Sequence, residues 1–371
     1  MEWRGDWPNA LLWIGSIQVL ISCLGTFGIL LRPGRIAWRR LLAASLFALL
    51  CALLAGAVAR PIAEDFAAVL SIGFLLIAAV FPLSGIGVWL CGYRRANLPV
   101  RIASWLAVAT LLVSCWATFV EPQRLTLEQH SLRVHILRSG NDPVRLGIMS
   151  DLHATGAGRH EHAAVDRLLA ARPDLILIAG DIYQGQDSAW PQALPELRTL
   201  FRRLIAPGGA FLVSGSCDRS DRLAELVAGT PVRLLENEQV TIAVRDRQVD
   251  LFGVSTHSPD SRGLSAFVDS PGVQGHLRLI LSHRPNLAAL SPTGPPVDLV
   301  IAGQTHGGQI RWPWGSAIAG FSPIPNRIRG GGLHSLNHQT VYVSRGVGVE
   351  RFWAPPLRLF CPPEVGLVVL E

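Results

Sequence analysis

The sequence contains no lysine, so arginine alone supplies all 33 basic residues. We attribute this to coding bias and derive no function from it. The formal net charge is +6, but the arginines are spread along the chain and form no basic run. Nucleic-acid binding requires a concentrated basic patch, so we expect no nucleic-acid partner.

Cysteine is scarce, and its spacing fits neither a metal site nor a redox pair. Four of the six cysteines lie inside apolar stretches of the first 120 residues, and no C-x-x-C or zinc-finger spacing occurs. The other two are Cys217 and Cys361. The sequence therefore supports neither a disulfide framework nor a cysteine-rich zinc site.

The first 120 residues are dominated by four long apolar stretches, at residues 10–31, 41–59, 66–91 and 102–120. Each is close to the roughly 20 residues that a helix needs to cross about 30 Å of hydrocarbon. We therefore predict an N-terminal transmembrane α-helical bundle of about four helices over residues 1–120. Three helices are the alternative, because Pro82 interrupts the third stretch. Glu2 and Asp6 make the N-terminus acidic, which argues against a cleaved signal peptide.

The distribution of arginine predicts how this bundle is oriented. The loops at residues 32–40 and 92–101 carry seven arginines, against four on the opposite side. Arginine-rich loops remain in the cytoplasm, so the chain after residue 120 is expected on the periplasmic or extracellular side. The predicted bundle and its orientation together indicate an integral protein of the bacterial inner membrane, with the lipid bilayer as a partner.

From about residue 121 the pattern changes to short apolar runs that alternate with amphipathic segments. Near-continuous apolar runs are typical of strands buried on both faces. They occur at residues 144–149, 175–179, 210–214, 249–254, 277–281 and 299–302. One helix is predicted before Pro207 and another between Ser220 and Gly229. This alternation predicts an α/β domain over residues 144–371, after a linker with the first strand or strands at residues 121–143.

Acidic residues and histidines follow five of these predicted elements directly. The segments are SDLH at 150–153, GD at 180–181, GSCD at 215–218, SH at 282–283 and GQTH at 303–306. Ligand sites of α/β sheets gather at the carboxyl ends of the strands. Carboxylates and imidazoles together suit Mn, Fe or Zn rather than Ca, so we expect a metal site at this edge.

In order and spacing, these segments resemble the signature of the calcineurin-like metallophosphoesterases, which reads D-x-H, GD, GNHD, H and GHxH. The corresponding stretches here are SDLH, AGDIY, GSCD, LSHRPN and GQTHGGQI. The endings YVSRGVG and CPPEVGLVVL look most like the membrane-associated branch, which includes UDP-2,3-diacylglucosamine pyrophosphatase-like members. The resemblance covers the chain from about residue 121 onward and implies an α/β/β/α sandwich of two mixed sheets.

The resemblance also implies roles for individual residues. Asp151, His153 and His306 would bind a first divalent metal. Asp181 would bridge the two metals and act in catalysis with His283, which would bind the second metal. Mn²⁺ is the expected ion, with Fe or Zn as alternatives.

The chain departs from the family pattern at three positions, all on the side of the second metal. Ser216 and Gln304 stand where the family has an asparagine and a histidine ligand. Their neutral oxygens bind a divalent ion more weakly than imidazole, so we expect a strong first site and a weak or empty second site. Cys217 stands where the family has a catalytic histidine. Its thiol is the candidate proton donor, with a small buried thiol as the alternative interpretation.

Three arginines close to these segments are candidates for binding the substrate phosphate, because a guanidinium pairs with phosphate oxygens bidentately. They are Arg219 after GSCD, Arg284 after SH and Arg345 in the segment SRG. For each of them, the alternative is an arginine of a solvated loop.

The sequence as a whole predicts a membrane-anchored, metal-dependent phosphoesterase. It would hydrolyse a phosphodiester or pyrophosphate bond of a lipid or lipid-linked substrate with a metal-activated hydroxide. The alternative is a weakened or inactive membrane protein that binds a metal or a phosphorylated lipid without turning it over. Ser216, Cys217 and Gln304 are the residues that favour this alternative.

Overall fold

The computed structural model describes residues 98–134, 142–257, 261–285, 297–318, 322–350 and 357–371. The chain divides into two compact units, residues 1–120 with 350–356 and residues 121–349 with 357–371. All the described β-strands belong to the second unit, which we call the α/β unit.

Six strands form the first sheet of the α/β unit. In spatial order they are β1 (Thr126–Leu132), β12 (Glu364–Leu370), β2 (Val144–Met149), β3 (Leu175–Ile178), β4 (Ala210–Leu212) and β5 (Val232–Leu234). Strands β2 to β5 are mutually parallel, whereas β12 pairs antiparallel with β2 and parallel with β1. Every residue of β3 is buried and apolar, as a strand covered on both faces requires.

Six further strands form the second sheet. In spatial order they are β10 (Gly332–Leu336), β11 (Gln339–Val343), β9 (Leu299–Ala302), β8 (Leu277–Ser282), β7 (Arg247–Val254) and β6 (Glu238–Val244). The four central strands are mutually parallel, and the two edge strands are antiparallel to their neighbours. Both sheets are therefore mixed.

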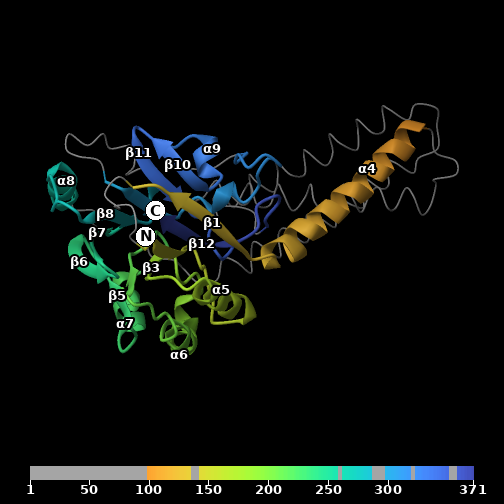
Figure 1. Ribbon diagram of the computed structural model, residues 1–371. Helices are drawn as coiled ribbons and strands as arrows, with labels where there is room; N and C mark the ends of the chain where they lie inside the picture. The colour runs from red at the N-terminus through yellow and green to blue at the C-terminus, as the bar shows by residue number, and fades with distance from the viewer. Residues whose placement is uncertain (1–97, 135–141, 258–260, 286–296, 319–321, 351–356) are drawn as a thin grey trace. The chain divides into compact units, whose positions relative to one another are not determined.

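Helices cover the outer faces of the two sheets (Figure 1). The helices of the α/β unit are α5 (Arg159–Ala170), α6 (Trp190–Phe201), α7 (Ser220–Val227), α8 (Ser261–Asp269) and α9 (Asn326–Arg329). Leu168, Leu197 and Leu223 join α5, α6 and α7 to the first sheet, and Phe267 and Ile328 join α8 and α9 to the second. Short helical turns are η3 (Glu121–Gln123), η4 (Asp187–Ala189) and η6 (His306–Gly308).

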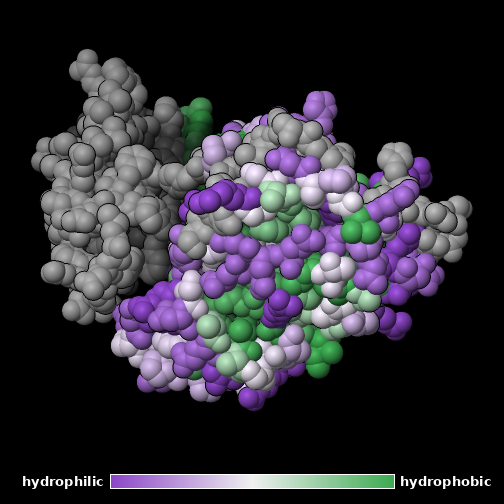
Figure 2. All heavy atoms as spheres, turned by 90° about the vertical axis from the view of Figure 1, so that its left-hand side faces the viewer, coloured by the Kyte–Doolittle hydropathy of each residue, from purple (hydrophilic) through white to green (hydrophobic). Residues whose placement is uncertain are grey.

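A third apolar core lies between the two sheets. It includes Leu146 and Leu177 from the first sheet and Leu251 and Leu279 from the second, all fully buried. The α/β unit thus has four layers, which fits the predicted α/β/β/α sandwich of two mixed sheets. On the face in Figure 2, hydrophilic residues surround a smaller hydrophobic area.

The predicted transmembrane bundle is corrected by the structure. Three of the predicted spans, at residues 10–31, 41–59 and 66–91, lie outside the described residues. The fourth falls on α4 (Leu98–Cys115) and the π-helical turn η2 (Trp116–Val120). Across the described part of the chain, no helix is both long enough and apolar enough to cross a bilayer. The bundle prediction and the localisation prediction, an inner-membrane protein with an external catalytic domain, are therefore wrong.

Candidate metal centre

The aspartates and histidines of interest follow the carboxyl ends of four strands. Asp151 and His153 follow β2 and Asp181 follows β3, in the first sheet. In the second sheet, His283 follows β8 and His306 lies in η6 after β9. Since β2 and β3 are parallel neighbours, as are β8 and β9, each sheet brings its loops to one edge.

The structure brings these five side chains together as two overlapping triads. The ligand atoms of Asp151, His153 and His306 lie within 4.8 Å of one another, and so do those of Asp151, Asp181 and His283. Asp181 also contacts both groups, because its Oδ2 lies 3.5 Å from Nε2 of His153 and 3.2 Å from Nε2 of His283. We call the five residues the metal-centre cluster.

Within the first triad, the two imidazoles face each other closely. Nε2 of His153 lies 2.9 Å from Nε2 of His306, and Nε2 of His306 lies 3.5 Å from Oδ1 of Asp151. All members of the cluster are buried, and His306, the most accessible of them, is only 5 % exposed. Nitrogen and oxygen atoms of buried side chains thus converge from loops that are far apart in the sequence.

The backbone of the cluster is held in an uncommon conformation. Four of its members have φ angles in the left-handed region, which residues other than glycine rarely adopt. The angles are 48° for Asp151, 42° for His153, 56° for Asp181 and 48° for His306. Such strain persists where surrounding contacts fix it, and it concentrates at functional sites. The geometry of the cluster is therefore imposed by its surroundings.

Asp218, the last residue of GSCD, is one source of this constraint, and the sequence analysis assigned it no role. It is buried, and its carboxylate accepts hydrogen bonds of 2.8 Å from the backbone amides of Asp181, Ile182 and Gly215. The amide of Cys217 in turn donates to Oδ1 of Asp181 at 2.7 Å. In the sequence, the only indication of this role was that Asp218 stands at the position of the aspartate in the GNHD segment of the family signature.

Two glycines allow the carboxylates to sit close to the backbone. A Cβ atom at Gly303 would lie 2.5 Å from Oδ2 of Asp151. A Cβ atom at Gly215 would collide with both the amide and Oδ1 of Asp181. Gly303 directly precedes Gln304, and Gly215 directly precedes Ser216. The backbone therefore approaches the two carboxylates closely next to the positions where this chain differs from the family signature.

Burial and mutual charge determine the protonation of the second triad. Burial alone lowers the pKa of His283, but the carboxylates of Asp181 and Asp151 and the carbonyl of Ala179 together outweigh it and raise that pKa to about 9. For Asp181, burial raises the pKa, yet the His283 imidazolium holds it well below its usual range. Burial raises the pKa of Asp151 to about 6. Without a metal ion, the proton on His283 thus offsets only part of the negative charge of the two carboxylates in this triad.

In the first triad, the histidine of GQTH is kept neutral. Burial, followed by the neighbouring His153, lowers the pKa of His306 well below its ordinary value. A neutral imidazole offers a lone pair, which is the form that a metal ion requires. This protonation state suits His306 to a role as a ligand.

The donor set fits a divalent transition metal. Three imidazoles and two carboxylates in a buried cluster suit Mn, Fe or Zn, whereas Ca²⁺ takes six to eight oxygen ligands. A divalent cation would also neutralise the carboxylates of Asp151 and Asp181, which are costly to bury without compensating charge. The structure and the residue groups thus indicate a divalent metal site without selecting one ion.

The three departing residues lie on the solvent-facing side of the cluster. Ser216 is exposed, and its Oγ lies 3.2 Å from Oδ2 of Asp181 and 3.2 Å from Nε2 of His283. Gln304 is half-buried, and its backbone amide donates to Oδ1 of Asp151 at 3.0 Å. Cys217 is also half-buried, and the Gln184 side-chain amide donates to its sulfur at 3.7 Å. The solvent-accessible positions of the site are therefore those that depart from the family signature.

The candidate phosphate-binding arginines have different surroundings. Arg219, before α7, is exposed and pairs with Asp221 at 2.9 Å. Arg284 is exposed beside His283. Arg345 is instead buried and paired with Glu364 at 2.7 Å and with Glu128 at 2.9 Å. Of the three, Arg345 is therefore engaged by carboxylates inside the fold.

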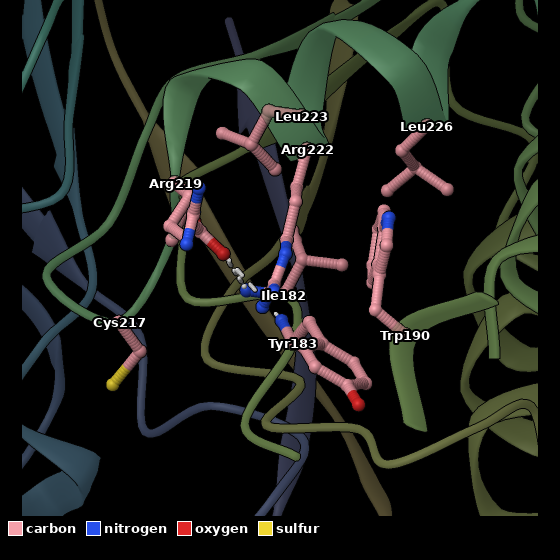
Figure 3. A pocket seen from close by; sticks show the side chains of 9 residues that line it. Ile182, Tyr183, Trp190, Cys217, Arg219, Arg222, Leu223 and Leu226 are labelled. Carbon is pink, nitrogen blue, oxygen red and sulfur yellow. Dashed lines mark hydrogen bonds between the residues drawn. The ribbon is translucent and has the colours of Figure 1, made fainter. Parts of the chain in front are cut away.

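A small pocket lies beside Cys217 and contains an arginine that the sequence analysis missed. Arg222 of α7 lies against the rings of Tyr183 and Trp190, at 5.9 Å and 5.4 Å from their centroids. Figure 3 shows Arg222 between these rings and Arg219, with Cys217 at one end of the pocket. The guanidinium also pairs with Asp187 at 2.9 Å. Only the spacing of Arg222 from GSCD could have indicated it.

Two mixed sheets in four layers, with carboxylates and imidazoles gathered at the strand ends, define a metal-dependent hydrolase domain. The model of the calcineurin-like phosphoesterase family matches residues 144–308, which contain the whole cluster. Residues 144–308 are thus similar to the calcineurin-like phosphoesterase family, as the resemblance implied.

Curated relatives agree with this family. The chain is 27 % identical over 267 residues to the metallophosphoesterase YkuE of Bacillus subtilis, covering 69 % of this chain and 89 % of the relative. It is 27 % identical over 288 residues to the phosphodiesterase YaeI of Escherichia coli, covering 75 % of this chain and 98 % of the relative. The prediction that the protein is an enzyme of the metallophosphoesterase class is confirmed by these comparisons.

Similarity to solved structures is weaker. The NAD nucleotidase of Haemophilus influenzae matches with a TM-score of 0.40 and 14 % identity, covering 58 % of this chain and 46 % of that chain. This likeness is too low to bear on fold or function. The closer resemblance to UDP-2,3-diacylglucosamine pyrophosphatase-like members stays a prediction.

Proposed function

We propose that this protein hydrolyses a phosphodiester or pyrophosphate bond with Mn²⁺ as its metal. Metal-dependent phosphoester hydrolysis follows from the family, and the bond type and the ion are our additions. The observation that carries the proposal is the pair of buried triads that share Asp151, with all ligand atoms of each triad within 4.8 Å.

Four residues would hold the first ion, and the remaining donors would hold a weaker second one. The first set is Asp151, His153, Asp181 and His306. The second site would use His283 with the oxygens of Ser216 and Gln304, so that its affinity is lower. When bound, a divalent cation lowers the pKa of water toward about 7 and supplies positive charge to a phosphoryl oxygen.

Protein side chains on the open side of the cluster would handle the substrate. Cys217 is half-buried, and its sulfur lies within 4.8 Å of a ring nitrogen of His153, so its S–H could face the leaving oxygen of an ester bound at the cluster. Transfer of that proton would form the leaving O–H group, and the resulting thiolate would recover a proton from water. The exposed guanidiniums of Arg219 and Arg284 could pair with phosphate oxygens.

A lipid or lipid-linked substrate has less support than the bond type. That prediction depended on the membrane bundle, which the described part of the chain does not contain. The name of the Escherichia coli relative instead specifies a phosphodiesterase. We therefore base the proposal on the phosphate linkage and leave the lipid as one arm of the assay.

The test is an assay of the purified full chain with Mn²⁺. Bis-p-nitrophenyl phosphate, p-nitrophenyl phosphate, inorganic pyrophosphate and a phospholipid extract would be compared as substrates. We expect turnover of the diester or the pyrophosphate, and a loss of more than about 100-fold in Asp181→Asn, because a ligand carboxylate is removed. Asp246→Asn, on the exposed turn between β6 and β7, is the matched control and should retain activity. Equal activity of the wild type and Asp181→Asn would overturn the proposal.

A further inference from the structure

Arg358 is a fully buried arginine that the proposed chemistry does not use. Its guanidinium donates to the carbonyl oxygens of Arg345 at 2.7 Å, Gly348 at 2.5 Å and Cys361 at 3.2 Å. Its hydrogen-bond acceptors in the described part of the chain are carbonyl oxygens and one sulfur, with no carboxylate among them. Burying a charge without a carboxylate partner is costly, so this residue needs an explanation.

The first segment that Arg358 binds is the loop behind Asp151. The amide of Val347 donates to the carbonyl of Ser150 at 3.0 Å, and that of Gly348 donates to the carbonyl of Asp151 at 2.7 Å. The fit is tight, because a Cβ atom at Gly346 would lie 2.6 Å from Cβ of Asp151. Arg358 donates hydrogen bonds to the carbonyl oxygens of Arg345, Gly346 and Gly348 in this same loop. It therefore fixes the loop that packs against Asp151.

The second segment that Arg358 binds supports His306. The thiol of Cys361 donates to the carbonyl oxygen of His306 at 3.2 Å. A Cβ atom at Gly307 would lie 2.5 Å from that sulfur, which shows how closely the two chains approach. Nη1 of Arg358 donates to the carbonyl of Cys361 and contacts its sulfur at 3.7 Å.

We propose that Arg358 is a positioning residue of the metal centre. It connects the loop that contacts Asp151 with the segment around Cys361 that contacts His306. Oδ1 of Asp151 and Nε2 of His306 lie 3.5 Å apart although they come from different sheets. A planar guanidinium with five donors can hold several carbonyls at once, which a lysine ammonium cannot do with the same geometry. The inference rests on the proposed function, since it takes Asp151 and His306 as ligands of one ion.

The experiment measures Mn²⁺ affinity, not activity alone. Full-length Arg358→Met and Arg358→Lys would be titrated with Mn²⁺ by calorimetry and by the electron paramagnetic resonance of the free ion. Outer groups that orient ligands typically change metal affinity by about 10–100-fold, so we expect weakening in that range for Arg358→Met. Arg358→Lys retains the charge but has fewer donors, so its affinity should lie between those of Arg358→Met and the wild type.

Arg278→Met is the matched control for the loss of a buried guanidinium. Arg278 is 5 % exposed and donates to the carbonyl of Phe267. It lies near the start of β8, five residues before His283, or roughly 16 Å along an extended strand. We expect a lower melting temperature with unchanged Mn²⁺ affinity, which separates positioning from general stability.

The outcomes distinguish this inference from the proposed function. Wild-type Mn²⁺ affinity in folded Arg358→Met would overturn the positioning role. If Arg358→Met does not fold, wild-type affinity in Arg358→Lys overturns it equally. If the wild-type chain itself binds no Mn²⁺, the proposed function fails and this inference fails with it.

Discussion

The hydroxyl of Ser216 lies 3.2 Å from Nε2 of His283, and the same oxygen is 3.2 Å from Oδ2 of Asp181. A short, neutral and exposed side chain therefore occupies the open side of the second triad. The buried members of the cluster match the family signature, whereas the departing residues are exposed or half-buried. The chemical difference from the family signature is thus located at the solvent-accessible positions of the site.

The first prediction concerns these departures. Ser216→Asn, Cys217→His and Gln304→His combined in one chain should raise the bound Mn²⁺ from near one toward two per chain, because amide and imidazole donors replace weaker ones. Metal analysis after gel filtration measures the ratio, and diesterase assays follow in parallel. Activity that appears only in this variant would favour the alternative of a weakened or inactive native protein. A ratio already near two in the wild type would contradict our expectation of a weak second site.

The second prediction concerns Asp218. Its carboxylate accepts three backbone amides at 2.8 Å, so Asp218→Asn replaces charge-assisted bonds and places an amide NH₂ against amide donors. We expect a loss of about 1–3 kcal/mol in the free energy of unfolding, and weaker metal binding because Asp181 shifts. Urea unfolding and Mn²⁺ titration measure the two effects. The control is Asp221→Asn, which changes an exposed aspartate of the same region; equal behaviour of the two variants would refute the assignment.

The third prediction concerns Gly215. An alanine there places its Cβ against the amide and the carboxylate of Asp181, which must shift to accommodate it. We expect Gly215→Ala to lose most of its diesterase activity, because even small displacements of a catalytic group are costly. Gly158→Ala is the control, since its Cβ would meet only the flexible end of the Glu161 side chain. Retention of wild-type activity and metal content in Gly215→Ala would show that this close approach is not required.

The fourth prediction concerns pH in the metal-free protein. His283 has a folded pKa of about 9, against ~6.5 in an unfolded chain. A raised histidine pKa stabilises the fold fully below pH ~6.5, and this contribution is lost as the pH rises through about 9. The melting temperature of the EDTA-treated protein should therefore fall between about pH 7 and 10, as calorimetry would record.

The control for this pH dependence is a pair of variants. His283→Asn should flatten the fall, whereas His338→Asn, at an exposed turn, should retain it. Bound Mn²⁺ should reverse the trend around neutral pH, because ligand imidazoles bind metal only when deprotonated. An identical pH profile in His283→Asn and the wild type would exclude His283 as the group responsible.

Much of the α/β unit could be predicted from sequence. The apolar run at residues 144–149 is β2, the run at 299–302 is β9, and the helix predicted from Ser220 is α7. Strands buried on both faces leave a near-continuous apolar signal, which explains this success. Strands β5, β6 and β10 were not predicted, because exposed and half-buried residues interrupt their apolar pattern.

The prediction of a transmembrane bundle over residues 1–120 was wrong because it was based on apolar composition alone. This composition indicated the spans, but the only predicted span within the described residues, at 102–120, falls on α4 and η2, and no described helix is both long enough and apolar enough to cross a bilayer. Hydropathy of a segment does not define where its helix begins and ends. That limit depends on the structure adopted by the chain.

The sequence by itself determined which residue types follow each strand, and hence that aspartates and histidines would gather at one edge of the fold. Only the tertiary structure decided that Asp151 belongs to both triads, that Asp218 fixes the backbone of Asp181, and that Arg358 joins two supporting segments. The physical reason is that strand signals are local, arising from neighbours along the chain. Contacts between loops of different sheets depend instead on how the two sheets pack, and no pattern within one segment records that packing.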